Sequence, residues 1–243
     1  MVALRLEVEQ NAVEQPRHRH LKGQLVLALH GAVTCDVSNA MWMAPPQHAV
    51  WIPGGTPHSN RATDNARIYF LFIDPGAVQM PRECCTLTIS PLIRELILHL
   101  AAEPAAYPEA GPTARLVAVL LEQLAEAPVA HLHLPISAHP KLRRIADALA
   151  VDPGDRRTLV QWAQSLAMSE RTLARLITRE TGLTFGRWRQ QLHLIIALRQ
   201  LAAGESVQRV AGNLGYDSVT AFITMFKKAL GKSPTQYFSS LRE

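Results

Sequence analysis

The sequence predicts an α+β protein of two domains, in which a small N-terminal β-barrel precedes an all-helical C-terminal domain. Strand-like apolar runs fill the part before Pro75, and helical periodicity begins near Ser90. The charge also changes sign: residues 1–138 hold 9 Lys+Arg and 12 Asp+Glu (net −3), whereas residues 139–243 hold 16 and 8 (net +8). We therefore divide the chain into a barrel (1–85), a helical dimerisation segment with a linker (86–138) and a basic domain (139–243).

The barrel is predicted from short buried-strand runs separated by turn residues. Residues 25–29 and 68–73 are continuous apolar runs, and Pro45-Pro46 and Pro53-Gly54-Gly55 lie between them. Many short strands with proline and glycine turns are typical of a small barrel or jelly roll.

Two amphipathic helices are predicted after the barrel. Leu92, Leu96 and Leu100 share one helical face, and residues 116–124 repeat this stripe after a proline-rich break. Such helices can cover the barrel or pair with a second subunit, and we expect a homodimer. Residues 129–140 are predicted to be a linker.

The basic domain is predicted to consist of about seven helices, because residues typical of helix N-termini recur along it. Pro140 and Pro234 fit first-turn positions, and Thr158 with Gln161 forms a capping-box pattern. Further predicted N-caps are Ser169, Thr184, Ser206 and Asp217 or Ser218.

Two helix-turn-helix units are predicted, at residues 159–180 and 207–230, joined by a long helix at about 185–203. Ala163 and Ala211 supply the small residue that a close helix crossing needs, and the pattern recurs about 48 residues later. In a basic domain this arrangement predicts binding of double-stranded DNA, with both recognition helices entering successive major-groove turns about 34 Å apart. The residues expected to face the DNA are Arg171, Thr172, Ala174, Arg175, Val219, Thr220, Ile223, Thr224, Lys227 and Lys228.

These residues carry a resemblance to the AraC/XylS transcription regulators over about 100 residues. The matching motifs are Met168-Ser169-x-Arg171-x-Leu173-x-Arg175, Gly182-x-Thr184-Phe185-x-x-Trp188-Arg189, Ala211-x-x-x-Gly215-Tyr216 and Phe222-x-x-x-Phe226-Lys227-Lys228-x-x-Gly231-x-Ser233-Pro234-x-x-Tyr237. The chain departs from the family at Thr224 and His193, where the family usually has arginine. The run from Pro45 to His58 is similar to members that regulate a nitroimidazole exporter, which implies control of a nearby transporter gene.

Histidines in the N-terminal half predict a metal site. His18 and His20 alternate on a strand and therefore share a face, and the turn at 53–55 can bring His58 alongside them. The spacing of His18, His20, Gln24 and His58 resembles the two cupin motifs, whose side chains converge on a metal. Gln24 replaces the usual acid. Three neutral imidazoles suit one divalent transition metal, with zinc or nickel favoured, and the alternative is a vestigial site whose histidines only form hydrogen bonds.

The leading interpretation is a DNA-binding transcription regulator, not an enzyme, that responds to a small molecule or a metal. Four aromatic residues are candidates for an effector pocket: Trp42, Trp51, Tyr69 and Phe70. The alternatives are a cupin-type metalloenzyme with an attached helical domain and an unliganded repressor. The apolar runs are too short to span a membrane, and no signal-peptide pattern precedes them, so we expect a cytoplasmic protein. Three cysteines argue against a disulfide framework.

Overall fold

The computed structural model divides the chain into two compact units, Met1–Ser38 with Trp42–His133, and Asn39–Met41 with Leu134–Glu243. It describes residues 2–7, 14–37, 40–45, 47–63, 65–104, 106–108, 110–130 and 132–239. Pro46 of the predicted turn lies outside these residues. Among the helices so described, none combines the length and the apolar character that crossing a membrane requires.

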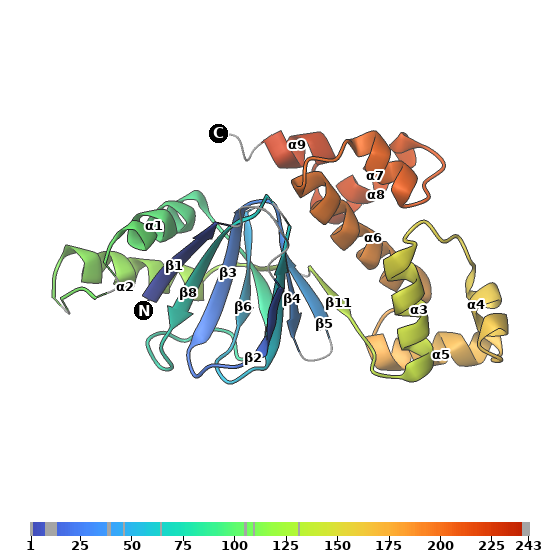
Figure 1. Cartoon of the computed structure of the whole chain (residues 1–243), viewed down its shortest axis with the longest axis horizontal. Helices are drawn as coiled ribbons and strands as arrows, with labels where there is room; N and C mark the ends of the chain where they lie inside the picture. The colour runs from blue at the N-terminus through green and yellow to red at the C-terminus, as the bar shows by residue number, and fades with distance from the viewer. Residues whose placement is uncertain are drawn as a thin grey trace. The chain divides into compact units, whose positions relative to one another are not determined.

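Two antiparallel sheets make up most of the N-terminal unit, in agreement with the predicted fold class (Figure 1). The first sheet has the order β1-β8-β3-β6-β9-β10, with β1 Val2–Glu7, β8 Arg67–Ile73, β3 Gly23–His30, β6 His48–Ile52, β9 Cys85–Thr88 and β10 Val129–Ala130. The second has the order β11-β5-β4-β7-β2, with β11 His133–Pro135, β5 Ala40–Ala44, β4 Val33–Val37, β7 His58–Ala62 and β2 Glu14–His18.

The first sheet is buried on both faces, which explains its continuous apolar runs. Leu25 and Leu27 of β3 belong to the core that includes residues of the two following helices. Val26 and Ala28, which point the other way, belong to the core shared with the second sheet. Successive side chains of a strand face opposite sides, so a strand covered on both faces has no polar positions in its sequence pattern.

Helices α1 (Pro91–Ala102) and α2 (Pro112–Ala125) pack on the first sheet and on each other, and thus cover the barrel (Figure 1). The predicted stripe is wrong at one position, because Leu92 is 52% exposed. The buried face consists of Ile93, Leu96, Ile97 and Leu100. The buried face is centred closer to Ile93 and Ile97 than the predicted leucine stripe is, so Leu92 in the first turn points away from the core.

The predicted linker at 129–140 is partly β-structure. β10 is a neighbour of β9 in the first sheet, and β11 is a neighbour of β5 in the second. Strands of two and three residues are too short to show a period in sequence. These residues form strands because each short segment pairs with a strand at the edge of a sheet.

From Pro140 onward the C-terminal unit is helical, and its predicted caps are confirmed. Thr158 Oγ1 accepts from Gln161 N (3.3 Å) and Gln161 Oε1 accepts from Thr158 N (2.8 Å), which completes the capping box. Ser218, and not Asp217, caps the second recognition helix. The helices are α3 Pro140–Val151, α4 Leu159–Ser165, α5 Glu170–Thr181, α6 Phe185–Ala202, α7 Val207–Asn213, α8 Val219–Leu230 and α9 Pro234–Ser239.

Candidate nucleic-acid interface and metal centre

The two helix-turn-helix units have the same backbone construction. Met168 N donates to Ala163 O (2.9 Å) in the first unit, and Tyr216 N donates to Ala211 O (3.0 Å) in the second. The residue before each donor has a positive φ, 51° at Ala167 and 72° at Gly215. The duplication at an offset of 48 residues therefore extends to individual hydrogen bonds and dihedral angles.

The recognition helices α5 and α8 are fixed by their inner faces. Leu173, Leu176 and Ile177 of α5 are buried, as are Phe222, Met225 and Phe226 of α8. Both helices end at a glycine in the left-handed region, Gly182 and Gly231. Equivalent positions in α5 and α8 are separated by 49 residues, so each outward residue of α5 has a counterpart in α8.

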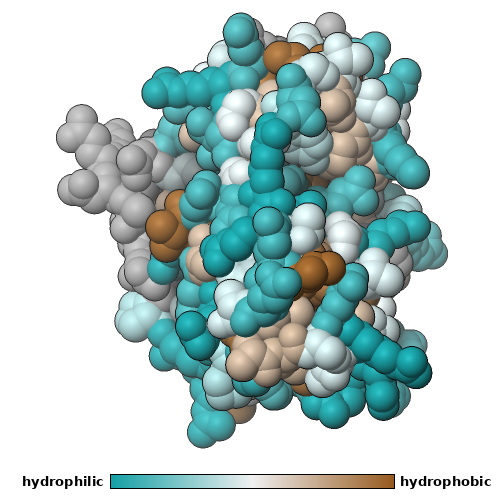
Figure 2. All heavy atoms as spheres, turned by 90° about the vertical axis from the view of Figure 1, so that its right-hand side faces the viewer, coloured by the Kyte–Doolittle hydropathy of each residue, from teal (hydrophilic) through white to brown (hydrophobic). Residues whose placement is uncertain are grey.

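The predicted DNA-facing residues of α5 are available to a ligand. Arg171, Thr172 and Arg175 are exposed, and Ala174 is half-buried. Among the described residues neither arginine forms an ion pair, so both guanidinium groups are free to bind guanine or phosphate. The side of the molecule that carries α4 presents a largely hydrophilic surface (Figure 2).

The outward face of α8 has a different chemistry. Thr220, Thr224, Lys227 and Lys228 are exposed, and Val219 and Ile223 are half-buried. At the positions equivalent to Arg171 and Arg175 it carries Thr220 and Thr224. The Thr224 hydroxyl donates to Thr220 O (2.9 Å). The second helix therefore offers methyl groups and hydroxyls where the first offers guanidinium groups.

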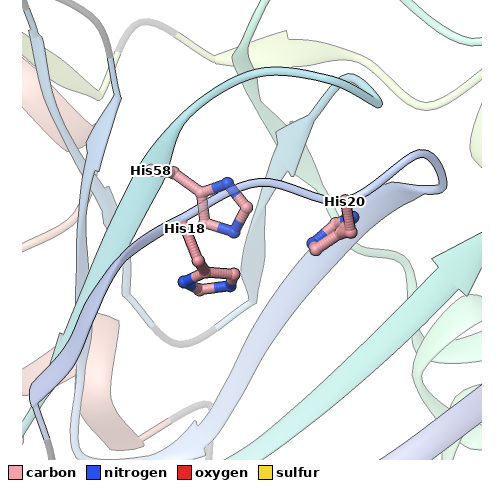
Figure 3. A group of neighbouring side chains, drawn as sticks. All are labelled: His18, His20 and His58. Atoms are coloured by element: carbon pink, nitrogen blue, oxygen red, sulfur yellow. The ribbon is translucent and has the colours of Figure 1, made fainter.

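The predicted metal ligands His18, His20 and His58 lie together in the N-terminal unit (Figure 3). His18 and His58 are paired in the register of β2 and β7, and their ring centroids are 4.4 Å apart. His20 follows in the connection to β3, with its ring centroid 5.1 Å from that of His58. One ligand nitrogen from each ring lies within 4.8 Å of the others.

Backbone carbonyl groups orient all three imidazoles in the same way. The Nδ1 atoms lie 2.8 Å from Pro16 O in His18, 2.6 Å from Lys22 O in His20 and 2.9 Å from Thr56 O in His58. A carbonyl oxygen only accepts, so each neutral ring must carry its proton on Nδ1. Each Nε2 lone pair is then left for another partner, which is the arrangement in which proteins hold metal-binding histidines.

The surroundings of His58 suit a metal ligand. The residue is buried, and its Nε2 has no hydrogen-bond partner among the described residues. Burial lowers the pKa of His58, and the neighbouring His18 and His20 lower it further, whereas the bond to Thr56 O acts in the opposite direction. The imidazole is therefore held in the neutral form that binds metals.

Gln24, the predicted fourth ligand, lies beside His20. Its side chain is 2% exposed, and Oε1 lies 3.4 Å from His20 Nε2. With the His20 proton on Nδ1, these two atoms are both acceptors, so a cation between them or a rotated amide is required. Zinc binds imidazole nitrogen at about 2.0–2.1 Å, which places two ligands of a tetrahedral ion roughly 3.4 Å apart. The chemistry of the donor set suits such an ion, although the three ring nitrogens, which lie within 4.8 Å of one another, would have to move closer together to bind it.

The predicted aromatic pocket is wrong as a single site. Trp51 and Tyr69 belong to the core beneath α1 and α2, whereas Phe70 belongs to the core between the sheets. Sequence reasoning missed two polar residues instead. Asn60 and Thr86 are buried, and among the described residues their side-chain polar atoms have no hydrogen-bond partner. Asn60 stands two residues after His58 on β7, a period-two signal that could have identified it.

Comparison with known proteins accounts for both units. Residues 4–134 match the AraC-like ligand binding domain family, and residues 162–240 match a helix-turn-helix domain family. The HTH-type transcriptional regulator NimR of Escherichia coli is 55% identical over 240 residues, which are 99% of this chain and 88% of that protein.

Two further similarities are weaker. The HTH-type transcriptional regulator RipA of Corynebacterium glutamicum is 29% identical over 103 residues, 42% of this chain and 31% of that protein. A crystal structure of ToxT from Vibrio cholerae aligns with 97% of this chain and 96% of that chain, at 10% identity and a TM-score of 0.40. The ligand-binding family match covers more than half of the chain, and NimR matches nearly all of it. The chain therefore belongs to the AraC family of transcription regulators, in which a ligand-binding domain precedes a helix-turn-helix domain.

Proposed function

We propose that this regulator binds a two-part operator through α5 and α8 and that its N-terminal unit senses a small molecule or a metal. The duplicated helix-turn-helix construction, with Arg171 and Arg175 exposed on α5, carries the proposal. Because its target is genomic DNA, we place the protein in the cytoplasm, and we propose a nearby transporter gene as a target. NimR and RipA are named as regulators, which favours this function over a cupin-type enzyme.

The two halves of the operator are expected to differ in sequence. Arginine pairs with O6 and N7 of guanine, whereas threonine and other methyl-bearing side chains contact the methyl group of thymine. Selection of duplexes from a random library by the full-length protein is expected to return a guanine-containing half-site and an A·T-rich one, about 10–10.5 base pairs apart. Recovery of one isolated half-site would contradict binding through both units.

We infer that His18, His20 and His58 bind one divalent transition metal, with Gln24 as a weaker fourth ligand. Two observations support this proposal: the buried Nε2 of His58 has no hydrogen-bond partner among the described residues, and backbone carbonyl groups hold the three Nδ1 atoms. Protein purified without an affinity tag and reloaded with zinc or nickel is expected to hold about one equivalent by elemental analysis. Since only neutral imidazole binds, occupancy should fall as the pH drops below about 6.

The metal prediction has a matched control within the chain. His58→Ala is expected to remove most of the bound metal, whereas His99→Ala, a change of an exposed histidine on α1, should leave the stoichiometry unchanged. Less than about a tenth of an equivalent in the wild type after reloading, unchanged in His58→Ala, would leave only the vestigial interpretation.

A small-molecule effector is proposed for the space between the two sheets. Asn60 presents a buried amide and Thr86 a buried hydroxyl, and unpaired polar groups of this kind are unfavourable unless a ligand or water satisfies them. Their cross-strand partners, Cys35 on β4 and Val50 on β6, belong to the apolar core between the sheets. A compact molecule with at least one hydrogen-bond donor and one acceptor fits these groups.

Homodimerisation through α1 and α2 is proposed from their outward faces. Leu92 of α1 is 52% exposed and Val119 of α2 is 42% exposed, although the other large apolar side chains of both helices are buried or half-buried. Light scattering at micromolar concentration is expected to give the mass of a dimer for the wild type and of a monomer for Leu92→Glu/Val119→Glu. Val151→Glu, at the 88% exposed end of α3, is the control and should remain dimeric. A monomeric wild type, with and without DNA, would refute the interface.

A further inference from the structure

A second connection joins the two helix-turn-helix units besides α6. The loop between α3 and α4 touches the turn of the second unit, backbone against backbone. A Cβ atom added to Gly215, whose φ is 72°, would lie 2.7 Å from Gly154 O, and one added to Gly154 would lie 2.9 Å from Asn213 O. Side chains at either position would therefore force these segments apart.

His193 of α6 lies at the centre of this connection. Its Nε2 is 3.0 Å from Pro153 O in the loop, and its Nδ1 is 3.4 Å from the Tyr216 hydroxyl in the turn. Since Pro153 O can only accept, the imidazole proton belongs on Nε2, and the tyrosine hydroxyl donates to Nδ1. One neutral tautomer thus satisfies both contacts, and it bridges three segments that are 23 and 40 residues apart in sequence.

The surroundings keep His193 in this form. Burial and, to a smaller extent, the charge of the nearby Arg189 together lower its pKa to about 4, against the opposing effect of the bond to Pro153 O. The tyrosine is also held in place, because its ring packs edge-on against Phe222, the buried anchor of α8. A shift of the loop is thereby coupled to the position of the second recognition helix.

Arginine side chains make further contacts around this connection. A cavity of about 420 Å³ lies between the loop, α6 and the turn, with Arg156, Arg189 and Gln190 in its lining. Arg156 donates to Gly215 O (2.6 Å) and pairs with Asp217 (2.6 Å), but both charged side chains are largely exposed. Exposed pairs contribute little, so the bonds of the half-buried His193 are the main specific link across the cavity among the described residues.

We propose that His193, with Pro153 O and Tyr216, forms a strut that fixes the distance between α5 and α8, so that the protein selects operators by the spacing of their half-sites. His193 is a positioning residue here, since it acts through the two recognition helices. One added base pair moves a half-site by about 3.4 Å along the duplex and turns it by roughly 34°. With the strut in place, α5 and α8 cannot move apart to follow that displacement of the half-site. Without the strut, the distance between the two helices can adjust. The inference rests on the proposed reading of two half-sites.

The test uses full-length protein and the duplex selected from a random library, with zero, one or two base pairs inserted between the half-sites or one removed. Dissociation constants are compared for wild type, His193→Phe, which keeps a ring beside Tyr216, and Tyr216→Phe, which removes only the hydroxyl. Gln190→Ala is the matched control, because this residue lines the same cavity from α6. Thermal unfolding of each variant shows whether it is folded.

The wild type is expected to prefer one spacing strongly. In both aromatic variants the ratio of affinities between that spacing and a one-base-pair insertion should fall by about 2- to 12-fold, the effect of one ordinary hydrogen bond. His193→Gln, whose amide can still donate to Pro153 O, should recover part of the preference, and Gln190→Ala should keep all of it. If the variants lose the same affinity at every spacing, or if their affinities depend on spacing as those of the wild type do, the proposed strut is wrong. The proposal of DNA binding would be unaffected by either result. A wild type indifferent to spacing would overturn the two-half-site reading itself.

Discussion

Replacing Phe222 with alanine is expected to lower the free energy of unfolding of the C-terminal unit by about 3–5 kcal/mol. The side chain is fully buried and its ring lies 5.6 Å from that of Tyr216 and 6.0 Å from that of Phe226. Removing it leaves a cavity at the point where α8 is anchored. Hydrogen exchange of the α8 amides under increasing denaturant measures this loss in the full chain.

The same substitution should weaken operator binding, because the second recognition helix is then folded for a smaller fraction of the time. Phe238→Ala, at a half-buried position on α9, is the control and should lose clearly less stability. A loss below about 1 kcal/mol for Phe222→Ala would show that the α8 core is not packed as described.

Arg175→Ala is expected to cost about 1–3 kcal/mol of operator affinity, a decrease of roughly 5- to 150-fold, and to relax the sequence preference at one base pair. The guanidinium is exposed and unpaired among the described residues, so folding stability should not change. Binding curves on the selected operator and on single-base-pair variants measure both effects. Arg171→Ala is expected to act in the same way at a second base pair of that half-site.

The second helix-turn-helix unit supplies the control for Arg175→Ala, because α8 has a residue at the equivalent position. Thr224→Ala changes the equivalent position of α8, where the hydroxyl already bonds to Thr220 O, and should reduce affinity much less. If Arg175→Ala weakens binding equally on every sequence, the residue contacts phosphate and does not read a base.

Local interactions explain how much of the DNA-binding unit the sequence could predict. Thr158, Ser169, Thr184 and Ser206 cap helices through bonds that span only three residues, so their patterns are visible in the chain. The inner faces of α5 and α8 follow the helical period. The outward positions of Arg171 and Arg175 then follow from the same period, which is why the candidate interface needed no tertiary information.

The sequence by itself determined the two-part architecture, the duplicated helix-turn-helix units and the grouping of His18, His20 and His58, because period, turn and spacing are local properties. Only the tertiary structure decided that Leu92 faces outward, that β10 and β11 join sheet edges, and that Trp51 and Phe70 belong to different cores. It alone placed His193 between Pro153 and Tyr216. Those outcomes depend on packing between segments that are far apart in the sequence. Such packing follows no sequence period, so it cannot be predicted from the sequence pattern.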